Sequence, residues 1–391
     1  MERISVTGFG IKAPNATNID QFRCILERGN NALNYVEHPT IGQIVCGVVR
    51  ETFEEVDGVK FKKYPRIVRM AISASYDAFS MSRIKNKKNS KKIAVIVGSS
   101  NGAAIEIEKH VLISKEKSYN RFPPTAIAKM NANSIVSGIT SFLGLNGMSL
   151  LITNSCTSSL DAINVAKSLL ETKQADACIV CGIDSSLTDI AFYGFSKIGI
   201  THRNSEISNG GPFSGKDYFA MAEGAGAVIL ERESDVLQED REIFGFINNV
   251  ASNQDGLSIY HSDLSGKWMN EAARQVLNGK QPDFVNSQAL GLEENDQIEK
   301  QLFQDLINDD VPISSIKGLF GHPFGAAGML QCVSSLLSMN YGFISPVTNT
   351  IGKDYLHLPI VRKTKYQKVD NVLITNHGYG GNNACLFMSK T

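Results

Sequence analysis

Short apolar runs of strand length alternate along the chain with longer runs of helical period, and this alternation limits the fold more than any other feature. The strand-like runs are Ile4–Gly8, Ile93–Val97, Ser149–Thr153, Ala177–Gly182, Gly226–Leu230, Phe244–Val250, Phe284–Asn286, Ile316–Phe320 and Asn371–Thr375. Apolar residues three and four apart predict helices over Ser158–Leu170 and Ala326–Met339. Strands that alternate with helices favour an α/β architecture with largely buried sheets.

A loose internal repeat indicates a duplicated fold. The strand-like run Ser149–Thr153 leads into Cys156 and then a helix. The run Ile316–Phe320 leads into His322 and then another helix. Two such elbows, each carrying a residue of a reactive type, predict two related halves with one site between them.

Length and composition fit a duplicated chain. Its 391 residues, 42% of them hydrophobic and 20% charged, suffice for two domains or for one large layered α/β domain. We expect an N-terminal half at residues 1–240 and a C-terminal half at 241–391. Because no linker rich in Pro, Gly or Ser marks the break, the halves are expected to pack as one body.

Charge and local composition exclude several kinds of partner. Lys plus Arg and Asp plus Glu both number 39, so no net charge would attract nucleic acid or anionic lipid. The basic cluster Lys85–Lys92 reads as a solvated loop, with a landing patch for an acidic carrier protein as the alternative. No apolar run approaches the roughly 20 residues of a membrane helix, and Met1–Val6 lacks the features of a signal peptide. We expect a cytoplasmic protein that contacts neither nucleic acid nor membrane.

The cysteines suit a reducing compartment. The chain has seven, an odd number, scattered through apolar runs, which is typical of reduced and mostly buried thiols. Cys178 and Cys181 have the spacing of a metal knuckle, but they lie in a strand-like run without a second Cys or His pair nearby. We interpret them as packing residues and expect no metal site.

Cys156 is the candidate nucleophile. It lies between an apolar strand and a helix, so the helix dipole and the free backbone N–H groups are expected to favour its thiolate. A thiolate in this position can accept an acyl group as a thioester. A buried structural cysteine is the alternative for a lone residue.

A series of motifs in order, with Cys156 among them, resembles the β-ketoacyl synthase family over nearly the whole chain. The motifs are Ile4–Ile11, Asn154–Ser159, Pro212-Phe213 followed by Ala222–Gly226, Ile316–Gly328 and Asn376–Asn383. The resemblance implies a thiolase-like α/β fold, with two related βαβαβ halves in five α-β-α-β-α layers, and a dimer whose interface lies near the site. It also implies that no cofactor is bound, because an acyl carrier protein supplies the phosphopantetheine.

One motif departs from the family pattern. Where condensing members carry His-Gly-Thr-x-Thr, this chain has Gln288-Ala-Leu290-Gly-Leu292. The family uses two imidazoles to decarboxylate a malonyl thioester and hold the enolate oxygen, while the threonines bind the phosphopantetheine arm. Glutamine cannot shuttle a proton near neutral pH, and leucine offers the arm no hydroxyl. Unaided chain elongation is therefore not expected.

The resemblance also assigns the other residues of the site. His322 occupies the family's second-His position, and Lys317 with Asp296 and Glu299 corresponds to an ion pair that braces the site. The C-terminal half of the chain, residues 241–391, would thus carry Gln288, His322 and the Gly-rich closing loop. The bracing residues are expected to survive although the imidazole at Gln288 is lost.

The closing loop places two side chains near the nucleophile by analogy. Tyr379 falls at the family's gating aromatic, and its backbone N–H with that of Cys156 would form an oxyanion hole. His377 is expected to line the gate or to pack beside it, with replacement of the missing imidazole as the alternative. Further aromatics that would line an acyl pocket, or belong to the ordinary core, are Phe192, Tyr193 and Phe195.

Several functions fit these residues. The favoured one is a subunit of a type II polyketide or fatty-acid synthase that resembles a chain-length factor, the partner of a catalytically complete ketosynthase subunit. A second is a non-elongating ketosynthase that acts as a Cys156 acyltransferase. Further alternatives are an active condensing enzyme that uses His322 and His377, and a structural protein with a relict site. An acyl carrier protein is an expected partner in all except the last.

Overall fold

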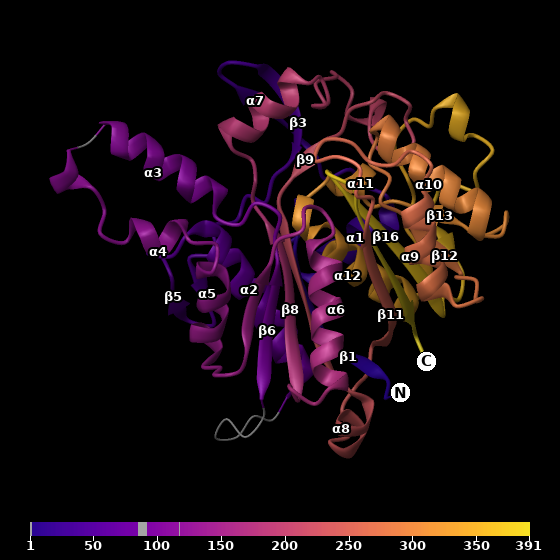
Figure 1. Ribbon diagram of the computed structural model, residues 1–391, viewed down its shortest axis with the longest axis horizontal. Helices are drawn as coiled ribbons and strands as arrows, with labels where there is room; N and C mark the ends of the chain where they lie inside the picture. Colours follow the sequence, from indigo (N-terminus) through magenta and orange to yellow (C-terminus); the bar gives the residue numbers. More distant parts are fainter. Residues whose placement is uncertain (1, 85–91, 117) are drawn as a thin grey trace.

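The structure is a computed structural model that describes residues 2–84, 92–116 and 118–391 (Figure 1). Nearly all of the basic cluster Lys85–Lys92 lies outside these ranges. No helix within the described ranges has the length and apolar character needed to cross a membrane.

A ten-stranded mixed sheet forms the centre, in the order β13-β12-β16-β17-β11-β1-β10-β8-β6-β7. Its N-terminal strands are β1 (Ile4–Lys12), β10 (Gly224–Arg232), β8 (Ala177–Asp184), β6 (Ile93–Gly98) and β7 (Ser149–Ile152). Its C-terminal strands are β11 (Gly245–Gln254), β17 (Asn382–Ser389), β16 (Asn371–Gly378), β12 (Phe284–Asn286) and β13 (Ile313–Ser314).

The two sets of strands have the same topology. In each set, read from the centre of the sheet outward, the first two pairings are antiparallel and the next two are parallel. The connectivity is also the same. Read from the centre outward, the strands of each set are the first, fifth, fourth, second and third of that set along the chain. The sets join where Ile4–Val6 of β1 pairs with Gly245–Ile247 of β11. Identical order and pairing are what a duplicated fold predicts.

Helices form the layers on either side of the sheet and between its halves (Figure 1). In the middle layer, α6 (Ser158–Glu171) packs on α12 (Ala327–Tyr341), and each of them contacts strands of both sets. Outside, α2 (Arg66–Ser82) and α5 (Ser134–Leu143) cover the N-terminal strands. On the opposite side, α9 (Lys267–Leu277) covers the C-terminal strands and α10 (Glu293–Leu306) packs on α9. This confirms the expected five-layered α/β fold.

The sequence of α12 explains its central position. Residues Ala327–Met339 are all buried, so the helix is apolar on every side. A helix of that kind belongs in a core rather than at a surface. Its polar side chains Gln331, Ser334 and Ser335 are hydrogen-bonded inside the core, as when the Gln331 amide donates to the Asn286 carbonyl at 2.8 Å.

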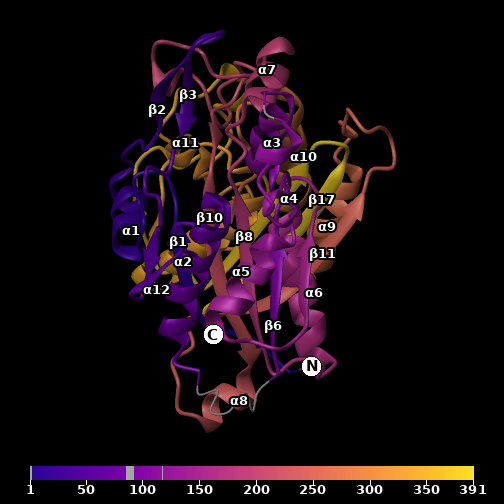
Figure 2. The ribbon, with the colours of Figure 1, turned by 90° about the vertical axis from the view of Figure 1, so that its left-hand side faces the viewer.

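The remaining elements surround this core, and Figure 2 shows β2, β3 and α7 together at the end of the molecule opposite α8. The helices among them are α1 (Ile19–Arg28), α3 (Ala104–Glu116), α4 (Ala126–Met130), α7 (Asp189–Lys197), α8 (Glu233–Gln238) and α11 (Lys317–Phe320). The strands are β2 (Asn34–His38), β3 (Gly42–Gly47), β4 (Glu55–Val56), β5 (Val59–Lys60), β9 (Met221–Ala222), β14 (Phe343–Ile344) and β15 (Lys365–Tyr366).

One expected strand is wrong. The run Ile316–Phe320 forms the short helix α11, and the strand that precedes His322 is the two-residue β13. All of Lys317–Phe320 is buried. A short apolar run has the same composition whether it becomes a buried strand or a buried helical turn, so periodicity cannot separate the two.

Candidate active site

The fold brings Cys156 and His322 together from the two halves of the chain. Sγ of Cys156 lies 3.1 Å from Nε2 of His322. The thiol follows β7 and precedes α6, while the imidazole lies between α11 and the 3₁₀ turn Phe324–Ala326. Both side chains are buried. The distance allows direct proton transfer between a nucleophile and its base.

The turn that carries Cys156 is held in an unusual conformation. Ser155 has φ 53°, in the left-handed region that residues other than glycine rarely adopt. The Thr157 hydroxyl donates to Asp161 at 2.7 Å and so fixes the first turn of α6. On the other side, a Cβ on Gly378 would come within 3.0 Å of the Cys156 backbone nitrogen. Only a glycine allows β16 to pass so near the nucleophile without displacing it.

Burial sets the charge state of the pair. It raises the pKa of the Cys156 thiol to about 11, against smaller lowering effects of the Ser155 hydroxyl and the Tyr379 backbone N–H. Burial also places the pKa of His322 well below its usual value, helped by the positive charge of Lys317. The thiolate expected from the helix position is therefore wrong for the resting site, because desolvation outweighs the helix dipole. Thiol and imidazole are both neutral.

A buried carboxylate that the sequence analysis missed positions the loop after His322. Asp184, at the end of β8, accepts the backbone N–H groups of Ser100 and Gly325 at 2.7 Å each and the Ser99 hydroxyl at 3.0 Å. Burial raises its pKa to about 6. The available signal was an acidic residue directly after the apolar run of β8.

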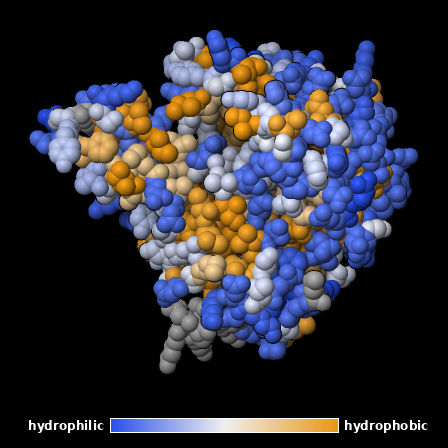
Figure 3. All heavy atoms as spheres, in the orientation of Figure 1, coloured by the Kyte–Doolittle hydropathy of each residue, from blue (hydrophilic) through white to orange (hydrophobic). Residues whose placement is uncertain are grey.

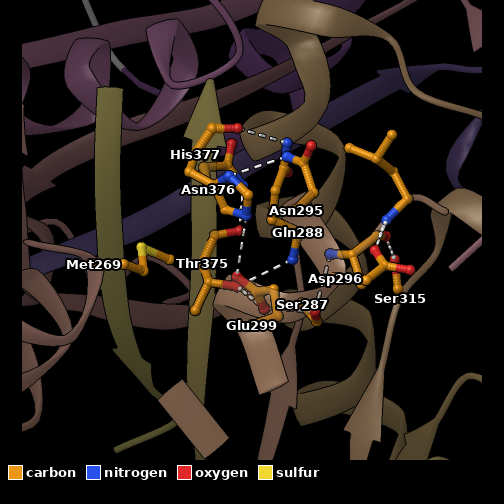
Figure 4. A network of polar contacts seen from close by, with 12 residues as sticks. Met269, Ser287, Gln288, Asn295, Asp296, Glu299, Ser315, Thr375, Asn376 and His377 are labelled. Atoms are coloured by element: carbon orange, nitrogen blue, oxygen red, sulfur yellow. Dashed lines mark hydrogen bonds and ion pairs between the residues drawn. The ribbon is translucent and has the colours of Figure 1, made fainter. Parts of the chain in front are cut away.

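Gln288 lies where the second family imidazole was expected. It is fully buried just after β12. Its side-chain nitrogen donates to the His377 carbonyl at 3.0 Å, and its backbone N–H donates to Thr375 Oγ1 at 3.0 Å (Figure 4). Its Oε1 has no hydrogen-bond partner among the residues that the structure describes. The side chain is thus tied to β16 and offers no proton-transfer group.

His377 is held between two side chains of α10 (Figure 4). Its Nδ1 lies 3.0 Å from the Asn295 amide nitrogen, and its Nε2 lies 3.8 Å from Oε1 of Glu299. With the Asn295 amide nitrogen as donor, Nδ1 accepts and Nε2 carries the hydrogen, for which there is no hydrogen-bond partner among the described residues. Burial lowers the pKa of His377 to about 3, so the ring is neutral. Nothing in the acidic sequence around Asn295 signalled this contact.

Lys317, Asp296 and Glu299 are brought together, but not as the expected direct ion pair. Lys317 donates from Nζ to the Ser287 carbonyl at 3.3 Å, and no contact between its ammonium and either carboxylate is found among the described residues. Burial lowers the pKa of Lys317 to about 7 against the opposing charge of Glu299. The ion pair is wrong as a contact: other donors occupy both oxygens of Asp296 and Oε2 of Glu299, while Glu299 Oε1 has no hydrogen-bond partner among the described residues.

The hydrogen bonds that Asp296 and Glu299 accept show what these two carboxylates do. Asp296 accepts three backbone N–H groups, from Phe213 at 2.6 Å, Leu290 at 2.9 Å and Gly291 at 3.2 Å. Glu299 accepts the hydroxyls of Ser287 at 2.6 Å and Thr375 at 2.8 Å. Burial raises the pKa of Asp296 to about 7 and also raises that of Glu299. Together they fix the loop that carries Gln288.

A cavity of about 1150 Å³ opens onto the pair, with Cys156, His322, Gln288, His377 and Tyr379 in its wall. Most of its remaining wall is apolar, as is usual for a small-molecule site. Large apolar side chains in the wall are Ile107, Ile190, Phe195, Ile198, Ile200, Phe219, Leu264, Leu290, Leu292 and Phe324.

Of the three aromatic residues expected to line the pocket, only one does so. Phe195 lines the cavity, whereas Phe192 packs edge-on against His38 and the Tyr193 hydroxyl lies 3.1 Å from Thr40 Oγ1. Cys178 and Cys181 are buried free thiols on β8. No group of three or more His, Cys, Asp or Glu side chains that could hold a metal occurs in the described part of the chain.

Comparison with known proteins gives the family. Residues 1–236 match the model of the β-ketoacyl synthase N-terminal domain, and residues 244–350 match that of its C-terminal domain. The chain belongs to the β-ketoacyl synthase family. It is 23% identical to the granaticin polyketide putative β-ketoacyl synthase 1 of Streptomyces violaceoruber, over 99% of this chain and 98% of that protein. It is 25% identical to the 3-oxoacyl-[acyl-carrier-protein] synthase 2 of Synechocystis, over 100% and 98%.

Solved structures of β-ketoacyl synthases share the fold. One is a type II polyketide synthase acyl-carrier protein in complex with its ketosynthase, with TM-score 0.90, 18% identity and full coverage of both chains. Another is the ishigamide ketosynthase/chain length factor, with TM-score 0.87, 19% identity and coverage of 100% and 99%.

In this member of the β-ketoacyl synthase family, the site has two parts that differ in their polar groups. Around Cys156 and His322 a nucleophile, a base and the Tyr379 backbone N–H converge. Around Gln288 and His377 each side chain makes one hydrogen bond, from Gln288 Nε2 to the His377 carbonyl and from the Asn295 amide to His377 Nδ1. The first part is equipped for acyl transfer. In the second, Gln288 offers no group that transfers a proton, and His377 Nε2 has no hydrogen-bond partner in the described part of the chain.

Proposed function

We propose that this β-ketoacyl synthase takes an acyl group onto Cys156 from a carrier-bound thioester and passes it on, without forming a carbon–carbon bond by itself. The observation that carries the proposal is the 3.1 Å contact of Sγ with His322 Nε2 at the wall of an apolar cavity. Gln288 in place of an imidazole supports the absence of unaided condensation. The polyketide and acyl-carrier-protein synthases among its relatives support a carrier-bound acyl substrate.

The transfer follows from the neutral pair. His322 Nε2 takes the thiol proton as Sγ bonds to the thioester carbonyl, and the oxyanion is held by the backbone N–H groups of Cys156 and Tyr379. Collapse breaks the bond to the carrier's sulfur, and that thiolate takes the proton from His322. Because proton and charge are returned, no bound cofactor is needed, and the phosphopantetheine arm enters as part of the substrate.

The test is intact-protein mass spectrometry after incubation of the isolated chain with an acyl carrier protein loaded with a saturated acyl group. The wild type is expected to gain the mass of one acyl group, and Cys156→Ala none. Cys181→Ala is the matched control, since Cys181 is also buried but lies outside the cavity. An equal adduct on Cys156→Ala, or no adduct on the wild type, would contradict the proposal.

A chain-length factor role, as the partner of a complete ketosynthase subunit, is the second candidate. The observation that favours it is Gln288, which is tied to the His377 carbonyl and transfers no proton. Its likeness to a ketosynthase/chain length factor structure agrees with this role. Co-expression with a complete ketosynthase separates the candidates. A chain-length factor would co-purify with that subunit and keep product formation in Cys156→Ala, whereas acyl transfer through Cys156 would lose it.

A further inference from the structure

The hydroxyl of Ser155 is a second polar group in contact with the nucleophile, beside the imidazole of His322. Its Oγ lies 3.8 Å from Sγ of Cys156, and Sγ is its only hydrogen-bond partner among the residues that the structure describes. Ser155 is half-buried and lines the cavity next to Cys156. Because the hydroxyl can donate to sulfur while His322 takes the thiol proton, the two contacts do not compete.

The backbone holds Ser155 in a conformation that serine does not favour. Its φ of 53° lies in the left-handed region, which glycine adopts readily and most other residues avoid. The turn is nonetheless fixed, since the Ser158 hydroxyl donates to the Ser155 carbonyl at 2.6 Å. Backbone outliers of this kind cluster at functional sites. Relative to glycine, serine adds a Cβ and the hydroxyl that contacts Sγ.

The passage of β16 leaves this side chain little freedom. A Cβ on Gly378 would come within 3.0 Å of both the Cβ and the Oγ of Ser155. The hydroxyl therefore lies directly against the β16 backbone, and the close packing on that side keeps it next to Sγ. A donor that is already in place costs no reorganisation when charge develops in a reaction.

Burial leaves charge on Sγ poorly stabilised, and Ser155 offsets part of that cost. Burial raises the pKa of the Cys156 thiol, and the Ser155 hydroxyl has the largest effect in the opposite direction, ahead of the Tyr379 backbone N–H. Hydrogen bonds to charged acceptors are stronger than those to neutral ones. Contacts that are long in a resting site often shorten in the transition state. The hydroxyl thus matters most at the moments when Sγ is negative.

We propose that Ser155 is a further catalytic residue, whose hydroxyl donates to Sγ of Cys156 while the sulfur carries negative charge. The inference rests on the proposed acyl transfer through Cys156. The charge on Sγ is greatest when the acyl group leaves. An acceptor thiol gives its proton to His322 and attacks the thioester, and the bond from the acyl carbon to Sγ breaks with its electron pair on sulfur. Sγ then takes the proton from His322, and Ser155 keeps its own proton throughout.

The first measurement is the rate of Cys156 alkylation by iodoacetamide at pH 8, which needs the thiolate but no acyl transfer. Ser155→Gly and Ser155→Ala both remove the hydroxyl, and each is expected to slow alkylation about tenfold. Ser155→Gly should keep the wild-type midpoint of urea unfolding, because the relieved strain offsets the greater flexibility of glycine in the unfolded chain.

Lys173→Gly is the matched control for the change of backbone. Lys173 is exposed just beyond the end of α6 and has φ 58°, so this variant makes the same exchange far from the sulfur. Its alkylation rate should equal that of the wild type.

The second measurement follows the step in which Sγ leaves. Cys156 is first acylated with butyryl-pantetheine, and discharge of the butyryl group to free pantetheine is then timed by mass spectrometry. Discharge should be about tenfold slower in Ser155→Gly and Ser155→Ala than in the wild type.

The outcomes separate this inference from the proposed function. Equal alkylation rates in the wild type and Ser155→Gly would overturn the inference and leave acyl transfer intact. A rate that falls in only one of the two Ser155 variants would place the effect in the backbone, which also overturns it. If Ser155→Ala fails to fold, Ser155→Gly with its Lys173→Gly control decides. A wild type that is alkylated at Cys156 but never acylated would overturn the proposed function itself.

Discussion

At the scale of single residues, the chemistry depends on how burial treats charge. Cys156 and His322 are adjacent and buried, so ionising the pair costs desolvation on both sides. A neutral pair reacts only when the thiol proton moves to the imidazole as the thioester is attacked. In the proposed acyl transfer, His322 therefore acts as a base during the reaction and does not maintain a thiolate at rest.

The first prediction concerns the pH dependence of thiol reactivity. Because the pKa of Cys156 is raised to about 11, its thiolate fraction should grow about tenfold per pH unit between pH 7 and pH 10. The rate of Cys156 alkylation by iodoacetamide, followed by mass spectrometry with Cys156→Ala as the blank, should rise throughout that range. A rate that is already constant below pH 8 would indicate a resting thiolate and contradict this account.

A second residue-scale prediction isolates the base. His322→Ala should slow acylation of Cys156 by about 10² to 10⁴, the usual contribution of a positioned general base. His357→Ala, at an exposed histidine, should leave the rate unchanged. Unfolding curves of both variants would show whether the fold is kept. A fall of less than threefold in a folded His322→Ala would remove the imidazole from the mechanism.

Sequence could supply some of these residues and not others. Cys156, His322 and Gln288 lie in motifs with a fixed local spacing, so the sequence was enough to name them. Asn295 and Asp184 reach the site only through contacts between distant elements, such as the bond from Gly325 to Asp184. Their roles depend on the fold and leave no local pattern. The ionisation of Cys156 likewise depends on burial, which the helix position alone did not reveal.

At the scale of elements, the site is built from loops that buried carboxylates hold in place. Asp184 fixes the turn after His322, and Asp296 fixes the loop before α10. The helices α6 and α12 are long and regular. The sequence runs Ser158–Leu170 and Ala326–Met339 therefore predicted their ends to within two residues. The short α11 was mistaken for a strand, because four buried residues contain too little periodicity to show a helix.

The glycine of the His322 loop provides an element-scale prediction. In Gly325→Ala, the new Cβ would lie 2.3 Å from the Ser100 backbone nitrogen and 2.6 Å from Asp184 Oδ2. Backbone cannot yield to such a contact, so we expect a loss of about 2 to 4 kcal/mol of stability and a displaced His322. Urea unfolding and the Cys156 acylation rate would measure the two effects.

Gly194 in α7 is the matched control for that substitution. A Cβ there meets nothing within 4 Å, so Gly194→Ala should gain about 0.5 to 1 kcal/mol from the better helix propensity of alanine. Equal stability of the two variants would contradict the tight packing of the His322 loop against Asp184.

At the scale of the whole molecule, duplication places one cavity between two halves of the same topology. Cys156 and Phe195 come to its wall from the N-terminal half, and Leu290 and Tyr379 come from the C-terminal half. Figure 3 shows apolar side chains gathered on the face of the molecule that is seen in Figure 1, interrupted by polar ones. A cavity of about 1150 Å³ with this lining has room for an acyl chain well beyond the thioester.

Filling that cavity should shorten the acyl groups that it accepts. Ala191 lies on α7 in the cavity wall, and Ala191→Trp would place an indole in the space. We expect acylation by a butyryl thioester to persist while that by a dodecanoyl thioester falls at least about tenfold, since overfilled sites reject bulk strongly. Tyr193→Trp, two residues along but outside the wall, should keep the wild-type ratio. An unchanged ratio in Ala191→Trp would place the acyl chain elsewhere.

The central claim is that the chain accepts an acyl group but does not extend it alone. The most direct test incubates the purified chain, without any second synthase, with an acyl-loaded and a malonyl-loaded carrier protein, and follows protein and carrier by mass spectrometry. We expect an acyl adduct on Cys156 and no β-ketoacyl carrier above the background without enzyme. A β-ketoacyl product that the chain forms alone, and that Cys156→Ala abolishes, would contradict it.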